Sequence, residues 1–201
     1  MFQKFFVTVA LLVAVFTQFS MAAWDGSKKT PKKVTQNDTL FYEITSPEEL
    51  IGFLDDVRAA DDMYKVNAYL KNDIVFGADT SKLSDKVFDF ENGKYFQSTF
   101  DGRGHTIYGL KSVHPLFKVI GQGQGRVVNL NIANSAFGSD TVLYAASVAE
   151  ENQGIIENVN VYNTNVRAVD VAGGIAANSR LQMSFPDTYI LNCNVVGGTE
   201  S

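Results

Sequence analysis

The stretch VNLNIANS at residues 128–135 decides the fold, because the chain returns to the same pattern twice more. The second copy is ENVNVYNT at residues 157–164, and the third is LNCNVVGG at residues 191–198. The copies align without gaps, so that Asn129, Asn158 and Asn192 match at intervals of 29 and 34 residues. Self-similarity with a period of this size is typical of solenoid proteins.

Within each copy, apolar residues at the third and fifth positions alternate with asparagines at the second and fourth. This period of two predicts a strand with one dry and one wet face. Strands stacked about 4.8 Å apart would bring Leu130, Val159 and Cys193 into one interior column. The asparagines would then face outward and form amide ladders along the stack. The two expected ladders are Asn129, Asn158 and Asn192, and Asn131, Asn160 and Asn194.

Other segments fit the same stack. A submotif of small residues at 145–149 recurs at 172–176, where the chain must turn tightly or its sheets approach closely. Residues 67–76 are expected to form an earlier strand, and residues 100–110 a strand, a glycine turn and a second strand. Residues 77–95 and 180–187 are expected to be surface loops. The sequence therefore predicts a mainly β, parallel solenoid over residues 66–201.

One helix is predicted ahead of the solenoid. Ser46 and Glu49 form a capping box, with Pro47 at the first helical position. The apolar residues that follow fall on one helical face as far as Ala60: Leu50, Ile51, Leu54 and Val57. Residues 41–65, a short strand and this amphipathic helix, are therefore expected to cap the open end of the stack.

The N-terminus reads as an export signal. Lys4 precedes an apolar run of about 12 residues, whereas a transmembrane helix needs roughly 20. Residues 1–22 are predicted to be a signal peptide cleaved after Ala22; the alternative is an uncleaved N-terminal anchor. No membrane span is expected after its removal, and secretion or exposure on the outer cell surface follows. Residues 23–40, with four lysines, are predicted to be an exposed leader, or alternatively a basic patch for an acidic partner.

The ordered set of motifs resembles the GLUG-repeat region of bacterial surface and secreted proteins. The residues that carry the resemblance are 100–107, Pro115 to Phe117, Val128 to Leu130, 172–176, and Asn192 with Cys193. The resemblance spans about residues 66–198. It implies a right-handed β-helix, an extracellular setting and an adhesion or display role, and it brings no catalytic residues. The chain departs from the family pattern where Ala146 and Ser147 replace a Gly-Gly pair, and where it stops at Ser201, directly after a strand. A C-terminal truncation is therefore expected.

Composition limits the chemistry. The formal net charge is −5, and it is one unit more negative without the leader peptide, whose only charged residue is Lys4. A chain with this negative charge is a poor candidate for binding nucleic acid through its phosphates. The single cysteine excludes an internal disulfide framework and a cysteine-built zinc site. His105 and His114, the only histidines, are not spaced as a metal pair.

The remaining reactive side chains favour structural roles. Asp101 is expected to bond the backbone of its glycine turn, with a ligand contact as the alternative. Glu157 aligns with Val128 and Leu191, so no acid recurs at that strand position, as paired carboxylates on neighbouring turns would require. The glycines at residues 121–125 precede no Lys-Ser/Thr and are expected to form a turn. Tyr144 and Tyr162 are candidates for a sugar-stacking surface, with ordinary packing as the alternative.

The sequence therefore predicts an exported, non-enzymatic β-helical module for adhesion or display, with no catalytic, cofactor or metal site. A polysaccharide or a surface protein is its expected partner. The alternative is the N-terminal scaffold of a longer, or a degenerate, carbohydrate-active β-helix enzyme.

Overall fold

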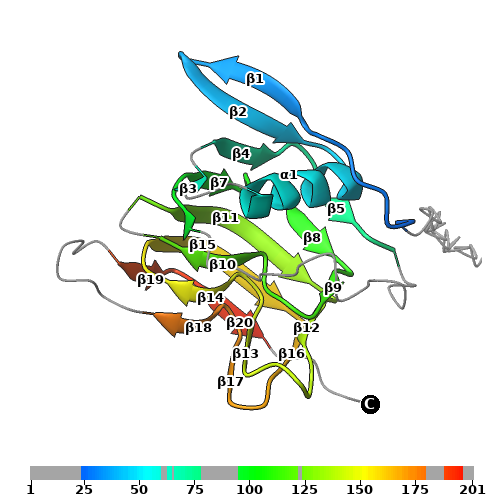
Figure 1. Ribbon diagram of the computed structural model, residues 1–201, viewed down its shortest axis with the longest axis vertical. Helices are drawn as coiled ribbons and strands as arrows, with labels where there is room; N and C mark the ends of the chain where they lie inside the picture. Colours follow the sequence, from blue (N-terminus) through cyan, green and yellow to red (C-terminus); the bar gives the residue numbers. More distant parts are fainter. Residues whose placement is uncertain are drawn as a thin grey trace, which may run out of the picture.

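The computed structural model describes residues 24–59, 63–64, 66–77, 95–121, 124–179 and 188–196. They form a parallel β-solenoid of about four turns, with one short helix near its N-terminal end (Figure 1). The fold class predicted from the repeats is therefore confirmed, and the handedness implied by the resemblance stays a prediction. The predicted signal peptide, most of the 77–95 loop and the 180–187 loop lie outside the described residues.

Four sheets run along the stack, and the chain visits them in a repeating order. Sheet A contains β1 (Lys32–Gln36), β2 (Thr39–Ile44), β4 (Asn67–Leu70), β5 (Ile74–Val75), β7 (Thr99–Asp101), β8 (Thr106–Tyr108), β11 (Arg126–Ala133), β15 (Ile155–Tyr162), β19 (Tyr189–Leu191) and β20 (Asn194–Val196). Sheet B contains β3 (Met63–Tyr64), β6 (Tyr95–Phe96), β10 (Phe117–Ile120), β14 (Ala149–Asn152) and β18 (Ala176–Ser179). Sheet C contains β9 (Lys111–Ser112), β12 (Ala136–Gly138) and β16 (Asn165–Arg167), and sheet D contains β13 (Tyr144–Ala146) and β17 (Val171–Gly173).

The register of the repeats is as the sequence predicts. Leu130 pairs with Val159, and Asn160 pairs with Asn194, both in parallel. The small-residue submotif also aligns, because β13 pairs with β17 residue by residue. Both Leu130 and Val159 are fully buried, and Cys193 packs partly buried against the same core. The predicted interior column is therefore confirmed.

At one place in sheet A, two neighbouring turns have different numbers of residues between the positions that pair. Strand β11 runs without a break, and its Val128 and Asn131 pair with Asp101 and Thr106 of the preceding turn. The two residues of β11 between these pairs therefore face four residues, 102–105, which form the predicted glycine turn. The turn stays bonded to β11, since Gly104 N donates to the Asn129 carbonyl and Asn131 N donates to the His105 carbonyl. The core register on either side of this turn is unchanged.

Helix α1 (Pro47–Ala59) covers the N-terminal end of the core. Its predicted apolar stripe is buried, and Phe53, also buried, lies with its ring centroid 5.7 Å from that of Phe100 and 6.2 Å from that of Phe96. Phe96 in turn stacks on Phe117 of the next turn at 4.5 Å. The helix therefore continues the aromatic column of the solenoid, which confirms its role as a cap.

The start of this helix corrects one detail of the expected capping box. The Ser46 hydroxyl accepts a hydrogen bond from the Glu49 backbone nitrogen, as predicted, at 3.4 Å. The Glu49 carboxylate, however, reaches Thr45 instead of Ser46, accepting from its backbone nitrogen at 2.8 Å and its hydroxyl at 2.6 Å. Thr45 offers two donors where the Ser46 backbone offers one. Burial acts to raise the pKa of Glu49, but the hydrogen bonds from Thr45 and Lys29 outweigh it and lower the pKa.

The prediction of an exposed leader at residues 23–40 is wrong in part. Trp24 is buried, and its ring meets that of Phe76 edge-on at 5.5 Å. Lys32–Gln36 forms β1, which pairs antiparallel with β2. Asn37 and Asp38 make the connection with φ values of 48° and 60°, the left-handed pair typical of a two-residue hairpin turn. The lysine-rich composition concealed this strand, because its outward side chains are charged.

Val159→Asp is expected to destabilise the protein by about 4 kcal/mol, because it places an unpaired carboxylate in a closed apolar column. Val169→Asp is the matched control, since Val169 lies in a turn and is 60% exposed, and its cost should stay within about 0.5 kcal/mol. Denaturant unfolding of both variants measures the difference. Equal stabilities would show that the inward assignment of Val159 is wrong.

Candidate polar face of sheet A

The outward face of sheet A is bent along a column of asparagines. Asn129, Asn158 and Asn192 have φ values of 54°, 54° and 52°, in the left-handed region that asparagine tolerates better than most residues. The sequence predicts ordinary outward strand positions for these residues, and their left-handed φ values show that this prediction is wrong. A left-handed residue turns the chain, so the face is not the long flat sheet that a strict period of two implies.

The bend also changes the phase of the buried side chains. Val127 and Leu130 are both fully buried, although three positions separate them. Val128 and Asn129, between them, are both partly exposed. Strict alternation would have put Val128 inside, so the turn at Asn129 shifts the pattern by one residue.

Hydrogen-bonded amide ladders run along this face. The second predicted ladder is confirmed over all three residues, and the first is confirmed between Asn129 and Asn158. Asn158 Nδ2 donates to Asn129 Oδ1 at 3.1 Å. In the second column, Asn160 Nδ2 donates to Asn131 Oδ1 at 2.9 Å, and Asn194 Nδ2 donates to Asn160 Oδ1 at 3.1 Å. Each bond joins one turn of the solenoid to the next, so the ladders hold the outer side chains in fixed orientations.

Asp101 extends the first ladder by one turn. Its Oδ1 accepts from Asn129 Nδ2 at 3.1 Å and from the Arg103 backbone nitrogen at 2.8 Å. The second bond is the local turn contact predicted for Asp101. The first was missed, because the inserted residues 102–105 hide the alignment of Asp101 with the asparagine column.

A third ladder was also missed. Asn163 Nδ2 donates to Asn134 Oδ1 at 2.8 Å, and both residues are left-handed, with φ values of 42° and 51°. Gly109, whose nitrogen donates to the Ala133 carbonyl in the next turn, has a φ of 69°. This column therefore marks a second corner of the solenoid. Asparagine at the seventh position of two repeats was the available signal.

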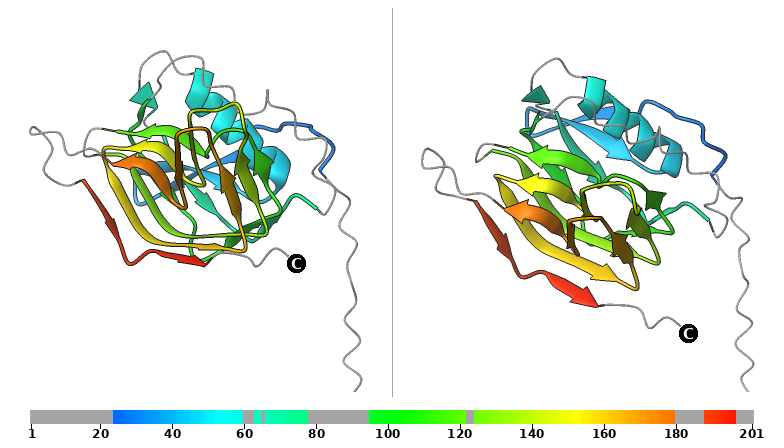
Figure 2. Two further views of the ribbon diagram at one scale, coloured as in Figure 1. Left: turned by 90° about the horizontal axis from the view of Figure 1, so that it is seen from below. Right: turned by 60° about the horizontal axis from the view of Figure 1, so that its bottom comes forward.

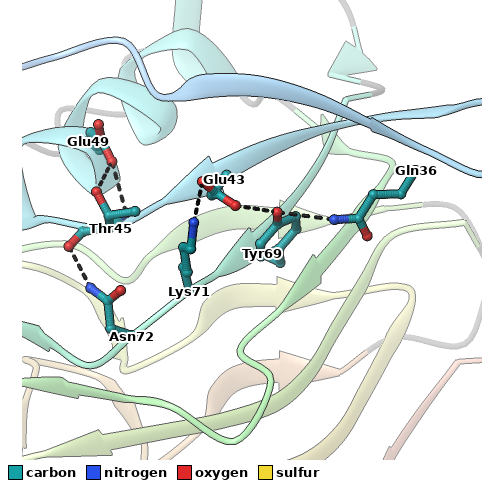
Figure 3. Close-up of polar contacts among 7 residues, drawn as sticks. All are labelled: Gln36, Glu43, Thr45, Glu49, Tyr69, Lys71 and Asn72. Atoms are coloured by element: carbon teal, nitrogen blue, oxygen red, sulfur yellow. Dashed lines mark hydrogen bonds and ion pairs between the residues drawn. The ribbon is translucent and has the colours of Figure 1, made fainter.

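The first turns carry a different polar network (Figure 3). The Tyr69 hydroxyl donates to Glu43 Oε2 at 2.7 Å, and Lys71 Nζ donates to Glu43 Oε1 at 2.9 Å. These two bonds hold the pKa of Glu43 below its ordinary value. Gln36 Nε2 donates to the Tyr69 hydroxyl at 3.1 Å, so the network joins the β1–β2 hairpin to the next turn.

Arg103, at the tip of the glycine turn, closes over the same tyrosine. Its guanidinium carbon lies 3.4 Å from the Tyr69 ring centroid, and Nη2 donates to Gln36 Oε1 at 3.2 Å. Tyr69 is consequently almost fully buried, and this burial, with the adjacent Glu43 carboxylate, raises its pKa. A stacked arginine above an aromatic ring stabilises the turn through a cation–π contact.

The two histidines lie apart from any metal arrangement. His105 Nδ1 is 3.3 Å from Asp73 Oδ1, and that oxygen also accepts from the Thr106 backbone nitrogen at 2.9 Å. The His114 backbone nitrogen donates to the Ser112 hydroxyl. Within the part of the chain that the structure describes, no three His, Cys, Asp or Glu residues come together as a metal site.

The other predicted residues are distributed over the molecule. Tyr162 lies on sheet A and is 40% exposed, whereas Tyr144 begins β13 of sheet D, so the two tyrosines do not share a face. Glu157 pairs with Val128 and Leu191, as the alignment predicts. Burial raises the pKa of the Cys193 thiol, whose sulfur lies 3.2 Å from the Leu191 carbonyl oxygen.

Gly125, in the turn predicted at residues 121–125, and Gly154 each lie close to the preceding turn. A Cβ on Gly125 would lie 2.2 Å from the Phe96 carbonyl oxygen, and a Cβ on Gly154 would lie 2.2 Å from that of Gly125. Gly125 and Gly154 therefore occupy equivalent positions in successive turns, and only glycine fits there. Residues 122–123 lie outside the described residues.

A titratable side chain with a shifted pKa also lies on sheet B. Burial raises the pKa of Glu150 on β14, the like charge of Glu151 adds to the shift, and Lys118 opposes it. Glu150 belongs to sheet B and is therefore not part of the polar face of sheet A.

Comparison of the chain with protein-family models, with curated proteins and with solved structures gives no match. Among the helices in the described ranges, none is both long and apolar enough to cross a membrane.

Asn160→Ala is expected to lower the free energy of unfolding by about 1–2 kcal/mol, because it removes the middle amide of a ladder and two hydrogen bonds with it. Asn165→Ala on sheet C is the matched control, since its side chain is exposed and outside the ladders described above. Thermal or denaturant unfolding compares them. If Asn165→Ala costs as much as Asn160→Ala, the ladder adds nothing to stability.

Proposed function

We propose that this chain is an exported, non-enzymatic solenoid module that presents the bent polar face of sheet A to a polysaccharide. The observation that carries the proposal is the set of amide ladders, which repeat the same side chains from turn to turn. The proposal includes the adhesion or display role that the resemblance to GLUG-repeat regions of bacterial surface proteins implies.

The ladders leave part of each amide available for a ligand. A side-chain amide has two N–H donors and two acceptor lone pairs. Each bond along a ladder uses one donor of one residue and one lone pair of the next, as between Asn160 and Asn131. The amides repeat at intervals of about 4.8 Å, the strand spacing of the stack. Asn158 and Asn194 are exposed, so the donor and lone pair that their ladder bonds leave unused are accessible to a ligand.

A regular array of this kind suits a repeating ligand. A polysaccharide carries hydroxyl groups at regular intervals, and each hydroxyl both donates and accepts hydrogen bonds. Single bonds of this type are weak, but several made by one polymer chain add through avidity. Because the neighbouring turns hold the amides in place, little side-chain entropy is lost on binding.

An exposed aromatic residue lies beside the ladders. Tyr162 follows Asn160 and Val161 on β15 and is 40% exposed. Aromatic rings combine a large apolar face with a polar hydroxyl group. Tyr162 is therefore suited to stack on a sugar ring bound along the ladders.

The export part of the proposal rests on the predicted signal peptide. When the chain is produced with its leader in a secreting bacterium, the exported protein is expected to begin at Ala23. Intact-mass measurement and N-terminal sequencing of the exported fraction test this. Retention of Met1 in the cell pellet would contradict export.

The binding part predicts retention of the protein on insoluble polysaccharides. Tyr162→Ala should weaken retention about tenfold or more, the equivalent of about 1.4 kcal/mol. Tyr144→Ala is the matched control, because Tyr144 lies on sheet D, and its retention should equal that of the unmodified protein. Failure of the unmodified protein to bind any member of a broad glycan panel would overturn polysaccharide binding and favour a protein partner.

A further inference from the structure

The two ends of the solenoid are finished differently (Figure 2). At one end α1 covers the aromatic core, and at the other β19 and β20 form the last strands of sheet A. In the described part of the chain, β19 and β20 pair with β15 only. Their outer edge therefore carries backbone N–H and C=O groups with no neighbouring strand among the described residues, which is a template for pairing with another chain.

Exposed apolar side chains concentrate at this edge. Of the nine large hydrophobic residues that are exposed in the described chain, five lie in β19 and β20. They are Tyr189, Ile190, Leu191, Val195 and Val196, and they are between 38% and 56% exposed. Ile190 and Val195 lie in register with the buried Ile156 and Val161, so the apolar core itself reaches the surface at this edge. Apolar surface gathered in this way marks interaction sites.

The edge also lacks the usual protection against pairing. Natural edge strands commonly carry lysine or proline, which prevents edge-to-edge association. The opposite edge follows this rule, because Pro31 precedes β1, and Lys32 and Lys33 lie on it. Residues 188–196 contain no charged residue and no proline. We name β19 and β20 the tail edge.

Two tail edges are electrostatically compatible with each other. An uncharged strand meets no like charge when it pairs with a second copy of itself. A tail edge cannot extend onto the other end of a second molecule in the same way, because there the edge strand β1 carries lysines and α1 covers the core. Only like ends can meet, which gives a closed pair instead of a filament.

We propose that two copies of this chain associate tail to tail, with β19 and β20 of each running antiparallel to those of the other about a two-fold axis. The pairing extends each ten-stranded sheet A into its partner, so backbone hydrogen bonds supply affinity in the manner of strand addition. It covers Ile190 and Val195 of each copy, which lie in register with the buried Ile156 and Val161 and continue the core to the open end. The partner is a second copy of this chain, and the proposal does not depend on a polysaccharide ligand.

The test compares the unmodified chain with two variants by sedimentation equilibrium. The unmodified chain should show a monomer–dimer equilibrium, with no larger species. Leu191→Lys should raise the dimer dissociation constant about tenfold or more, because it puts a charge on each strand of the pair. Lysine is tolerated there in the monomer, since Leu191 is 48% exposed and pairs with Glu157.

Leu40→Lys is the matched control. Leu40 is 42% exposed on β2, at the other end of the same sheet, so the substitution adds the same charge at a similar exposure. The dimer dissociation constant of Leu40→Lys should equal that of the unmodified chain. Any association through the N-terminal leader affects the unmodified chain and both variants alike. Hydrogen exchange should show concentration-dependent protection of amides 189–196 in the unmodified chain and in Leu40→Lys only.

Three results would overturn the proposal. The first is a monomer for the unmodified chain at all concentrations, and the second is a dimer that Leu191→Lys leaves unchanged. The third is an open series of larger species, which requires unlike ends to meet. Val196→Lys, at a position 54% exposed, repeats the test if Leu191→Lys fails to fold.

Discussion

The left-handed asparagine corner is the constraint on which the rest of the solenoid depends. At Asn129 and Asn158 one residue satisfies two requirements: its backbone takes the conformation that bends the sheet, and its amide bonds the turn above or below. The bend sets which side chains enter the core, since Val127 and Leu130 are both buried on account of it. The backbone hydrogen bonds of the parallel strands set the distance between turns, and the ladder adds side-chain bonds in the same register. Alanine at this position would lose the amide, and glycine would keep only the backbone freedom.

The strand register and the cap were predictable because each is local in sequence. Three ungapped repeats defined which residues share a column, and the spacing of Leu50, Ile51 and Leu54 defined a helix with one apolar face. The bend was not predictable in the same way. An asparagine between two apolar residues is compatible both with an outward strand position and with a left-handed corner, and only the burial of Val127 distinguishes them.

The other differences arise from contacts between residues distant in sequence. Asp101 joins the ladder across an insertion that breaks the alignment, and Arg103 reaches Gln36 and Tyr69 from a separate turn. The sequence of β1 shows no apolar alternation, because it begins with two lysines. Its pairing with β2 is therefore not visible as a period in the sequence. The Glu49 carboxylate accepts hydrogen bonds from Thr45 and not from the expected Ser46 backbone. Propensity and period hold no information on such pairings.

The variable place in sheet A has a consequence for the evolution and engineering of the chain. Residues 102–105 form a turn with two extra residues at the level of the asparagine corner, while the paired strands on both sides keep their register. The corner therefore separates two halves of each rung that are aligned independently. A longer peptide grafted between Gly102 and His105 would leave the strands on both sides paired as they are, but it would displace Arg103 from Tyr69 and from Gln36. This turn therefore fastens the β1–β2 hairpin to the next rungs, and lengthening it would loosen that attachment.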